Sequence, residues 1–321
     1  MIPGQDLVLS CTGISHAFGE RRVLHGVDLH VARGQIVGLV GPSGCGKSTL
    51  LNAIFGTLAL GQGGVTVHSR MGNRYDVDGI GPDRCMVYQD YDLYPHLTAL
   101  QNVAFGLMVR DTSIASRVFR PLAWRAQRQR MRDKAAALLE RVGLASALDK
   151  YPHELSGGMR QRVALAQALV MEPEVLLLDE PFGALDEANR EGLQQMLLTL
   201  YAENVAAQRS GGKPPHTLVI VTHEIDEALL VGDRVVGLSQ FWDWKGAGHE
   251  ACPGATVVYD AAAPVETPGT GIDRAGYAPQ RALIREVVMD PVRTKAPVGE
   301  HVRFWQQAAA GEARGVVDRV P

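Results

Sequence analysis

The stretch GPSGCGKST, at positions 41–49, has residue types and a spacing that suit the binding of a phosphate chain. Its glycines let backbone N–H groups come close to phosphate oxygens, and Lys47 can reach the terminal phosphates of a nucleotide. Ser48 can supply a hydroxyl ligand to Mg²⁺, and a helix that starts here adds the positive end of its dipole. The stretch therefore predicts a site for a nucleoside triphosphate and magnesium.

Two acids and a histidine could supply the rest of a phosphate-transfer site. Asp179 ends the apolar run VLLLD, Glu180 follows it directly, and His223 ends another apolar run, TLVIVTH. Asp179 could hold Mg²⁺, Glu180 could take a proton from the attacking water, and His223 could sense the terminal phosphate. Adjacent acids also occur on solvated edges, and such a histidine can be a structural cap. These residues are therefore informative only in combination with the phosphate loop.

The stretch LSGGMRQR, at positions 155–162, has the features of a second anion site. Ser156 offers a hydroxyl, Gly157 and Gly158 allow close approach of the backbone, and the run that follows has a helical pattern. It lacks the lysine of the phosphate loop. Alone, this stretch would bind an anion only weakly.

The elements around these residues must bring them to one place. QIVGLV predicts a buried strand and STLLNAIFG predicts a helix, so the phosphate loop lies between a strand and a helix. The carboxyl ends of parallel strands border the crevice in which α/β proteins bind ligands. If VLLLD and TLVIVTH are further strands of that sheet, their terminal polar residues face the phosphates.

The composition is that of an ordinary globular protein. Of the 321 residues, 46% are hydrophobic and 21% are charged, with a formal net charge of −3. This charge gives no bulk attraction to polyanions, so we expect no nucleic-acid partner. The four cysteines form no CxxC pair, which disfavours a zinc module or a disulfide framework. No secretion signal is expected, and no apolar run reaches the roughly 18 residues of a membrane span.

Taken in this order, the motifs resemble those of the nucleotide-binding subunits of ATP-binding cassette (ABC) transporters, over roughly residues 7–240. GPSGCGKS matches the Walker A loop, LSGGM the signature and LLLDE the Walker B strand of that family. The resemblance implies an α/β fold, with a RecA-like P-loop ATPase core, an antiparallel β subdomain and an inserted α-helical subdomain at about residues 90–160.

The resemblance also implies a role for each matched residue. Glu180, His223 and Gln89 would be catalytic. Mg²⁺ would be held by Ser48, Gln89 and Asp179. Contacts with ATP are implied for Phe18, Gly41, Ser43, Gly44, Cys45, Gly46, Lys47, Ser48, Thr49, Ser156, Gly157, Gly158 and Asp186. Phe18 would stack on the adenine, although a lone phenylalanine before a turn is as often a core residue.

Partners follow from the same resemblance. Members of the family dimerise head to tail, so the signature of one copy would close over the phosphates held by Walker A of a second copy. The subunit would lie peripherally on the cytoplasmic face of the inner membrane, bound to two permease subunits and linked indirectly to a solute-binding protein. The predicted patch of Tyr91, Leu93, Tyr94, Leu97 and Leu100 would accept a permease helix, unless these residues are core.

The residues within and around the motifs favour an importer. GPDRCMVYQ and THEIDEAL resemble nitrate, sulfonate and taurine importers, whereas LYPHLT and NVAFGL also occur in sugar and polyamine importers. The implied cargo is a nitrate-, sulfonate- or taurine-like solute or a small nitrogen compound. Exporters share every motif, so an exporter subunit is the alternative. A GTPase would need an NKxD motif, which the sequence lacks, and a nucleotide kinase has no use for LSGGM.

Three regions differ from a compact importer subunit. The stretch 117–134 is strongly basic with a single acid, which predicts either a solvated helix face or a face turned to permease loops or anionic lipid. The Gly and Pro residues of AENVAAQRSGGKPPHT, at 202–217, predict a surface loop. We place the ATPase domain at 1–240 and a C-terminal extension at 241–321, with a last strand in ATVVY and a tail rich in Pro, Gly and Ala.

Overall fold

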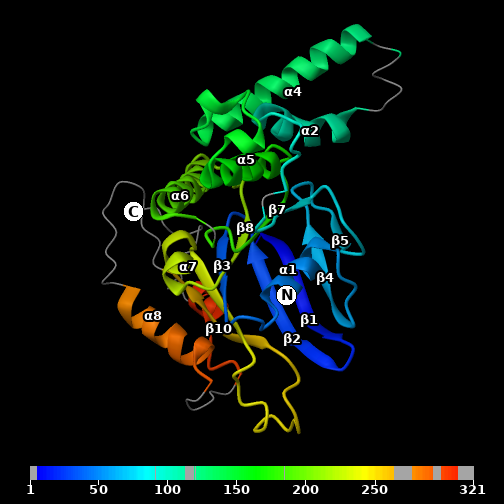
Figure 1. Ribbon diagram of the computed structural model, residues 1–321. Helices are drawn as coiled ribbons and strands as arrows, with labels where there is room; N and C mark the ends of the chain where they lie inside the picture. Colours follow the sequence, from blue (N-terminus) through cyan, green and yellow to red (C-terminus); the bar gives the residue numbers. More distant parts are fainter. Residues whose placement is uncertain are drawn as a thin grey trace.

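Two β-sheets and a group of helices make up the part of the chain that the computed structural model describes (Figure 1). The described residues are 6–90, 92–112, 119, 121–183, 185–263, 277–291 and 298–309. Figure 1 shows the helices α2, α4 and α5 gathered at one end of the molecule, beyond both sheets. Among the described residues, none of the helices combines the length and the apolar character that crossing a membrane requires.

The larger sheet carries the predicted site residues. Its strand order is β11-β10-β9-β3-β8-β7-β6, and the strands from β9 to β6 run parallel to one another. Strand β10 is antiparallel to β9, and β11 is parallel to β10. The strands are β3 (Ile36–Val40), β6 (Arg84–Val87), β7 (Val175–Asp179), β8 (Leu218–Thr222), β9 (Arg234–Ser239), β10 (Thr256–Ala262) and β11 (His301–Val302).

Helices cover both faces of this sheet, because its central strands are apolar along their whole length. In β3, Ile36 joins the cluster that includes α6 (Glu187–Arg209), whereas Val37 and Leu39 join the cluster that includes α1 (Lys47–Phe55). The short helix α7 (Ile225–Val231) packs on β3 as well. Burial on both faces explains why these strands read as continuous apolar runs.

The smaller sheet is antiparallel and packs beside α1. Its order is β2-β1-β4-β5, formed by β1 (Leu7–Phe18), β2 (Arg21–Ala32), β4 (Gln62–His68) and β5 (Arg74–Asp76). Alternate residues of β2, including Val27 and Leu29, are buried in one cluster with Leu50 and Leu51 of α1. The start of the phosphate loop helix is therefore fixed from two sides.

The helical subdomain is inserted between β6 and β7. It contains α2 (Ala99–Asp111), α4 (Pro121–Arg141), α5 (Gly157–Leu169) and the short 3₁₀ turns η1 (Ala145–Ala147) and η2 (Pro152–Glu154). Thr98 and Gln101 form a capping box that starts α2. Pro121 stands at the first position of α4, where a helix tolerates proline. Val103, Leu139 and Leu165 are buried together and join the three helices.

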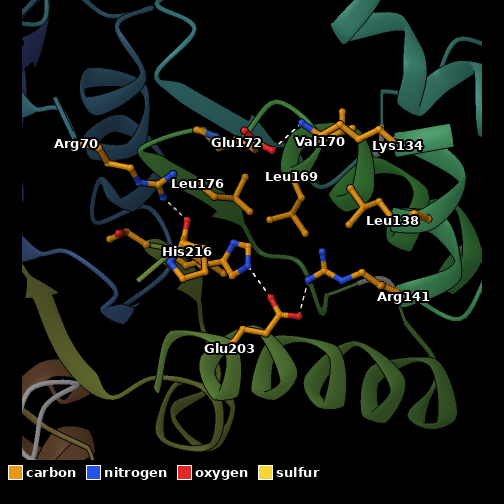
Figure 2. A pocket seen from close by; sticks show the side chains of 15 residues that line it. Arg70, Lys134, Leu138, Arg141, Leu169, Val170, Glu172, Leu176, Glu203 and His216 are labelled. Atoms are coloured by element: carbon orange, nitrogen blue, oxygen red, sulfur yellow. Dashed lines mark hydrogen bonds and ion pairs between the residues drawn. The ribbon is translucent and has the colours of Figure 1, made fainter. Parts of the chain in front are cut away.

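Ion pairs link this subdomain to α6 and to the segment that precedes β7, around a cavity of about 370 Å³ (Figure 2). Lys134 Nζ lies 2.6 Å from Glu172 Oε1, and His216 Nε2 lies 2.8 Å from Glu203 Oε2. Arg141 of α4 pairs with the same Glu203, which belongs to α6. The cavity lies at the amino ends of β7 and β8, away from the phosphate loop. We assign it to the junction of the subdomains rather than to the nucleotide.

The C-terminal part packs against β9, β10 and α7. It includes α8 (Ala278–Ile284), the π-helix η4 (Arg285–Met289) and α9 (Phe304–Ala309). Trp242, Tyr259, Ile284 and Val288 are buried together, and a Cβ at Gly237 of β9 would lie only 2.4 Å from Val288 Cγ2. This close packing requires glycine at that point of the strand.

A buried arginine joins this part to the sheet. Arg234 of β9 donates to both carboxylate oxygens of Asp260 of β10 at 2.6 Å, and its side chain is 1% exposed. Its guanidinium also lies 4.2 Å from the ring centre of Phe304 and 5.0 Å from that of Trp305, on α9. One side chain thus organises two strands and the last described helix.

The structure corrects one prediction. The segment 202–217 is not a loop throughout, since α6 continues to Arg209 and only the residues from Ser210 to β8 form the connection. Leu193, Leu197, Leu200 and Tyr201 place a continuous apolar stripe on α6, and this stripe outweighs the Gly and Pro residues that follow it. Tyr91, Arg117 and Arg120 lie outside the described residues.

The Arg234 pair gives a prediction on stability. Asp260→Asn should lower the free energy of unfolding by about 3–5 kcal/mol, because it leaves a buried guanidinium without its opposite charge. Asp226→Asn is the matched control, since Asp226 pairs with Arg281 on the surface and is 57% exposed. The control should cost less than about 1 kcal/mol. Urea unfolding measures the free energy of unfolding of both variants. Equal losses would show that the buried pair stabilises the protein no more than the surface pair does.

Candidate active site

The phosphate loop connects β3 to α1 and wraps the start of that helix. Gly44 and Gly46 adopt positive φ values of 74° and 107°, a conformation that side chains other than glycine rarely take. A Cβ at Gly46 would also lie 2.8 Å from Val23 Cγ1. At the start of the loop, a Cβ at Gly41 would lie 2.2 Å from the backbone oxygen of Leu238. The loop can therefore keep its path only with glycine at these positions.

Lys47 is held inside this loop. Its Nζ donates to the backbone oxygens of Gly41 at 2.8 Å and Pro42 at 3.1 Å, and the residue is 5% exposed. An ammonium group has three N–H bonds, so one remains for a phosphate oxygen. The charge is fixed in place before any ligand arrives.

Cys45 turns away from the space in which a phosphate would bind. Its Sγ donates to the backbone oxygen of Leu238 at 3.3 Å, and the residue is 2% exposed. Burial raises the pKa of the Cys45 thiol. The side chain of Cys45 is therefore not available for the predicted contact with ATP.

Ser48 and Asp179 meet across two different elements. Ser48 Oγ, in the first turn of α1, donates to Asp179 Oδ1 at 3.2 Å, at the end of β7. Burial raises the pKa of Asp179, while the hydrogen bond from Ser48 opposes this effect. A hydroxyl beside a half-buried carboxylate is a pair of oxygen donors suited to Mg²⁺, so these residues fit the predicted metal.

Glu180 has an unusual backbone. Its φ is +48°, in the left-handed region that a non-glycine residue enters at a cost of about 1–3 kcal/mol. Its N–H donates to the backbone oxygen of Val221 at 3.0 Å, so the neighbouring strand β8 holds it there. Its Oε2 lies 3.5 Å from His223 Nδ1. The strained turn directs the carboxylate toward the phosphate loop, whose cavity it lines.

Gln89, two residues beyond the end of β6, lies close to Glu180. The Gln89 amide and the Glu180 carboxylate both lie beside Gly183. A Cβ built at Gly183 would lie 3.4 Å from Gln89 Nε2 and 3.8 Å from Glu180 Oε2. The pKa of the preceding Tyr88 is raised, first by burial and then by the charges of Asp92 and Asp179. The segment after β6 therefore lies within the electrostatic field of Asp179.

The cavity over the phosphate loop has a volume of about 290 Å³. It is lined by Phe18, Arg21, Val23, Ser43, Gly44, Gly46, Lys47, Ser48, Thr49 and Glu180. Phe18 is 55% exposed, and its ring is thus available for stacking. The position of Arg21 was not predicted, although its guanidinium would lie 4.0 Å from a Cβ at Gly44. Arg21 directly follows the turn at Gly19 and Glu20, and nothing in the neighbouring sequence indicates that it reaches the phosphate loop.

Ser156, Gly157 and Gly158 do not line that cavity. They begin α5, where Ser156 is the N-cap and its Oγ accepts the N–H of Met159 at 3.3 Å. The helix N-terminus and the hydroxyl are thus exposed at a separate surface of the same chain. The hydroxyl and the helix start that the predicted anion site requires are present, but a single chain does not bring them to its own phosphate loop.

Asp186 lies beside this helix start and not beside Lys47. It is the N-cap of α6, and its carboxylate accepts from both the backbone and the side chain of Asn189 at 2.9 Å. A Cβ at Gly158 would lie 2.1 Å from Asn189 Oδ1. Asn189 was not predicted, yet it joins Asp186 to the LSGGM stretch through a contact that only glycine allows.

The sequence matches the family model described as ABC transporter over residues 24–183. This chain belongs to the ABC transporter ATP-binding family. The match spans the phosphate loop, the LSGGM stretch and the two acids, so the geometry described above is that of an ABC cassette. The predicted family and fold class are confirmed.

Relatives with assigned names are similar over the cassette. The chain is 42% identical over 221 residues to the nitrate import ATP-binding protein NrtC of Synechococcus elongatus, an alignment covering 69% of this chain and 29% of that protein. It is 44% identical over 224 residues to the sulfate/thiosulfate import ATP-binding protein CysA of Bordetella bronchiseptica, covering 70% and 57%. The chain thus spans less than two thirds of the length of these curated relatives.

Solved cassettes share the fold. The ATP-binding cassette MJ0796, in a dimeric post-hydrolysis state bound to ADP and Pi, is 29% identical with a TM-score of 0.54, covering 71% of this chain and 93% of that chain. CbiO1 from Clostridium perfringens, part of the ABC transporter complex cbiONQ, is 27% identical with a TM-score of 0.57, covering 72% and 84%. The ABC core is therefore common to all three chains.

The contact at Gly158 can be tested in the isolated ABC chain. Gly158→Ala should lower the free energy of unfolding by about 1–3 kcal/mol, because the new methyl group displaces Asn189 from Asp186. Gly157→Ala is the control, since a Cβ there meets no atom within 4 Å. The control should change stability by less than about 0.5 kcal/mol. Equal destabilisation of the two variants in thermal unfolding would show that Asn189 of α6 does not pack against Gly158 of α5.

Proposed function

We propose that this chain is the ATP-hydrolysing subunit of an ABC importer, with the ATPase domain at 1–240 and an extension at 241–321. The observation that carries the proposal is the convergence of Lys47, Asp179, Glu180 and His223 at the carboxyl ends of β3, β7 and β8. The names of the relatives support the direction of transport, since NrtC and CysA are import proteins. An exporter subunit, which has the same motifs, is the less favoured alternative.

Each residue then has a defined part in hydrolysis. Lys47 and the N–H groups of the loop bind the β and γ phosphates, and Phe18 stacks on the adenine. Glu180 accepts a proton from the attacking water, as a general base does. His223, 3.5 Å from that carboxylate, holds it and contacts the terminal phosphate. Gln89, whose amide lies beside the Glu180 carboxylate at Gly183, would complete this part of the site.

Mg²⁺ is the proposed cofactor. Ser48, Asp179 and Gln89 would hold it, and when bound it would neutralise part of the charge on the β and γ phosphates. Since burial raises the pKa of Asp179, its carboxylate gains more from a nearby cation than an exposed one does.

The second half of each site is proposed to come from a second copy. Ser156, Gly157 and Gly158 present a hydroxyl and a helix N-terminus with no phosphate of their own, and the similar cassette MJ0796 is dimeric. In a head-to-tail pair, these groups close over the phosphates that Lys47 of the other copy binds. Asp186, linked to Gly158 through Asn189, lies where the copies meet.

Two permease subunits are the proposed membrane partners, contacted by the helical subdomain at the cytoplasmic face of the membrane. Of the predicted patch, Leu100 is buried and Leu93 packs against the same core, so these two residues support the fold. Tyr94 is 40% exposed and contacts Phe105 of α2, with ring centres 4.7 Å apart. We therefore place the permease contact at Tyr94 and the adjoining face of α2.

The cargo is proposed to be a small oxyanion. The names of the relatives refer to nitrate, sulfate, thiosulfate and bicarbonate, the last in CmpC of Synechococcus elongatus at 41% identity. A sulfonate, taurine or another small nitrogen compound is a weaker choice. A solute-binding protein is proposed to deliver the cargo to the permease.

Removing the proposed base tests the chemistry. Glu180→Gln should hydrolyse ATP at least about a hundredfold more slowly, because general-base catalysis usually contributes a factor of this size. The variant should still bind ATP and accumulate as a closed dimer. Lys47→Ala is the contrasting variant, because it should weaken ATP binding itself. Turnover near the normal rate in Glu180→Gln, measured in the assembled transporter, would remove Glu180 from this role.

Mixed dimers test whether Ser156 serves the other copy. Homodimers of Lys47→Ala and of Ser156→Arg should both be nearly inactive, since each damages both sites. A mixed dimer places both defects in one site and leaves the other site intact, so ATPase activity should return above both homodimer baselines. If the signature acts within its own chain, every site keeps one defect and mixing restores nothing. Formation of the mixed dimer is checked by two affinity tags.

A further inference from the structure

The N-terminal half of α4 is an exposed basic surface that the proposed function does not use. Figure 1 shows this half extending beyond α2 and α5, away from both sheets. It bears Arg125, Arg128, Arg130 and Arg132, with Asp133 as the single acid between positions 122 and 133. Within the described residues, none of the four arginines has an ion-pair partner, and Asp133 is hydrogen-bonded to Gln129.

Large apolar side chains are exposed at the same end. Phe119 is 82% exposed and Leu122 is 80% exposed. Val109 on α2 is 58% exposed and Leu283 on α8 is 37% exposed, so the two side chains at α4 are more accessible than these. Successive helical residues are rotated by about 100°, which puts Leu122, Ala126 and Gln129 on one strip. On the same geometry, Arg125 lies about 60° to one side of Leu122 and Arg130 about 80° to the other. The part of this strip from Leu122 to Gln129 is thus weakly polar and bordered by arginines on both sides, and the acid Asp133 lies on the same strip about one turn further on.

This arrangement matches an anionic lipid surface. Arginines attract the acidic headgroups, and their long stems let the guanidinium stay at headgroup level while Leu122 and Phe119 enter the apolar layer below. A protein partner would be recognised by a shaped recess and by acids placed opposite individual arginines. Here the cations diverge to both sides of the helix, which suits a charged surface wider than the helix itself.

We propose that the N-terminal half of α4 binds the surface of a membrane containing anionic phospholipid. The contact goes beyond the proposed transport function, which supplies only its setting beside a membrane. It adds a second attachment, directly to lipid, to the one made through a permease. Because it belongs to the isolated chain, it can be measured without transport or ATP hydrolysis.

The experiment is sedimentation of the purified chain with phosphatidylcholine vesicles, prepared with and without phosphatidylglycerol. The wild type should bind only the vesicles with phosphatidylglycerol, and added salt should release it, because screening weakens attraction between exposed charges. Arg125→Glu combined with Arg130→Glu should lower the partition coefficient at least about tenfold, since each basic residue near the surface contributes to binding. Thermal unfolding confirms that each variant is folded.

Two controls match this variant. Arg209→Glu with Arg285→Glu makes the same change in net charge at exposed positions outside α4, and it should lower binding less than about threefold. For the apolar strip, Leu122→Ser should weaken binding several-fold, whereas Met71→Ser, at a residue 90% exposed in the turn between β4 and β5, should not. If the Arg125 and Arg130 double variant fails to fold, the Leu122→Ser comparison decides.

The proposal is overturned if vesicles with and without phosphatidylglycerol bind the wild type equally, or if the α4 variants and their controls behave alike. It is also overturned if vesicle binding is unchanged and the double variant instead loses co-purification with permease subunits, because α4 then contacts protein. Failure of the proposed ATPase function looks different. Glu180→Gln with unchanged turnover would refute that function and leave vesicle binding as it was.

Discussion

The parallel pairing of β3, β8 and β7 is the constraint on which the nucleotide site depends. Val40 pairs with Thr222 and Asp179 pairs with Val221, so the three strands end at the same edge within one residue of register. The residues that follow them, in the phosphate loop, at Glu180 and at His223, must therefore meet. A slip of one residue in any strand would turn its side chains to the other face and separate these groups.

The same register explains why strain persists at Glu180. The hydrogen bond from its N–H to the backbone oxygen of Val221 continues the ladder by one residue beyond the strand. This bond holds Glu180 in a left-handed conformation that is unfavourable for a residue other than glycine. Elsewhere in the chain the sheet is secured by contacts remote from the nucleotide, above all Arg234 with Asp260. The stability of the scaffold and the strain of the site are thus located at opposite sides of β3.

The sequence was sufficient to predict whatever depends on local pattern. The glycines around Lys47, the acids after VLLLD and the capping serine at 156 lie on strand ends and helix starts that short segments specify by themselves. Contacts between distant segments were not predictable in this way. Arg21 reaches the phosphate loop only because β1 and β2 pair, Asn189 meets Gly158 only because α6 packs on α5, and Leu93 belongs to a core that three helices complete. The extent of α6 differs from the predicted loop because the apolar stripe of the helix outweighs the glycine and proline residues beyond its end.

The inward position of Cys45 has a consequence for redox chemistry. A thiol reacts with oxidants and alkylating reagents as its thiolate, which burial disfavours here, and the sulfur is covered on the side away from the nucleotide. Cys252, by contrast, is exposed. Mild oxidation or treatment with a bulky maleimide therefore modifies the surface thiol first and leaves the phosphate loop chemically intact, so a label attached at Cys252 can report on this protein while the nucleotide site keeps its native residues.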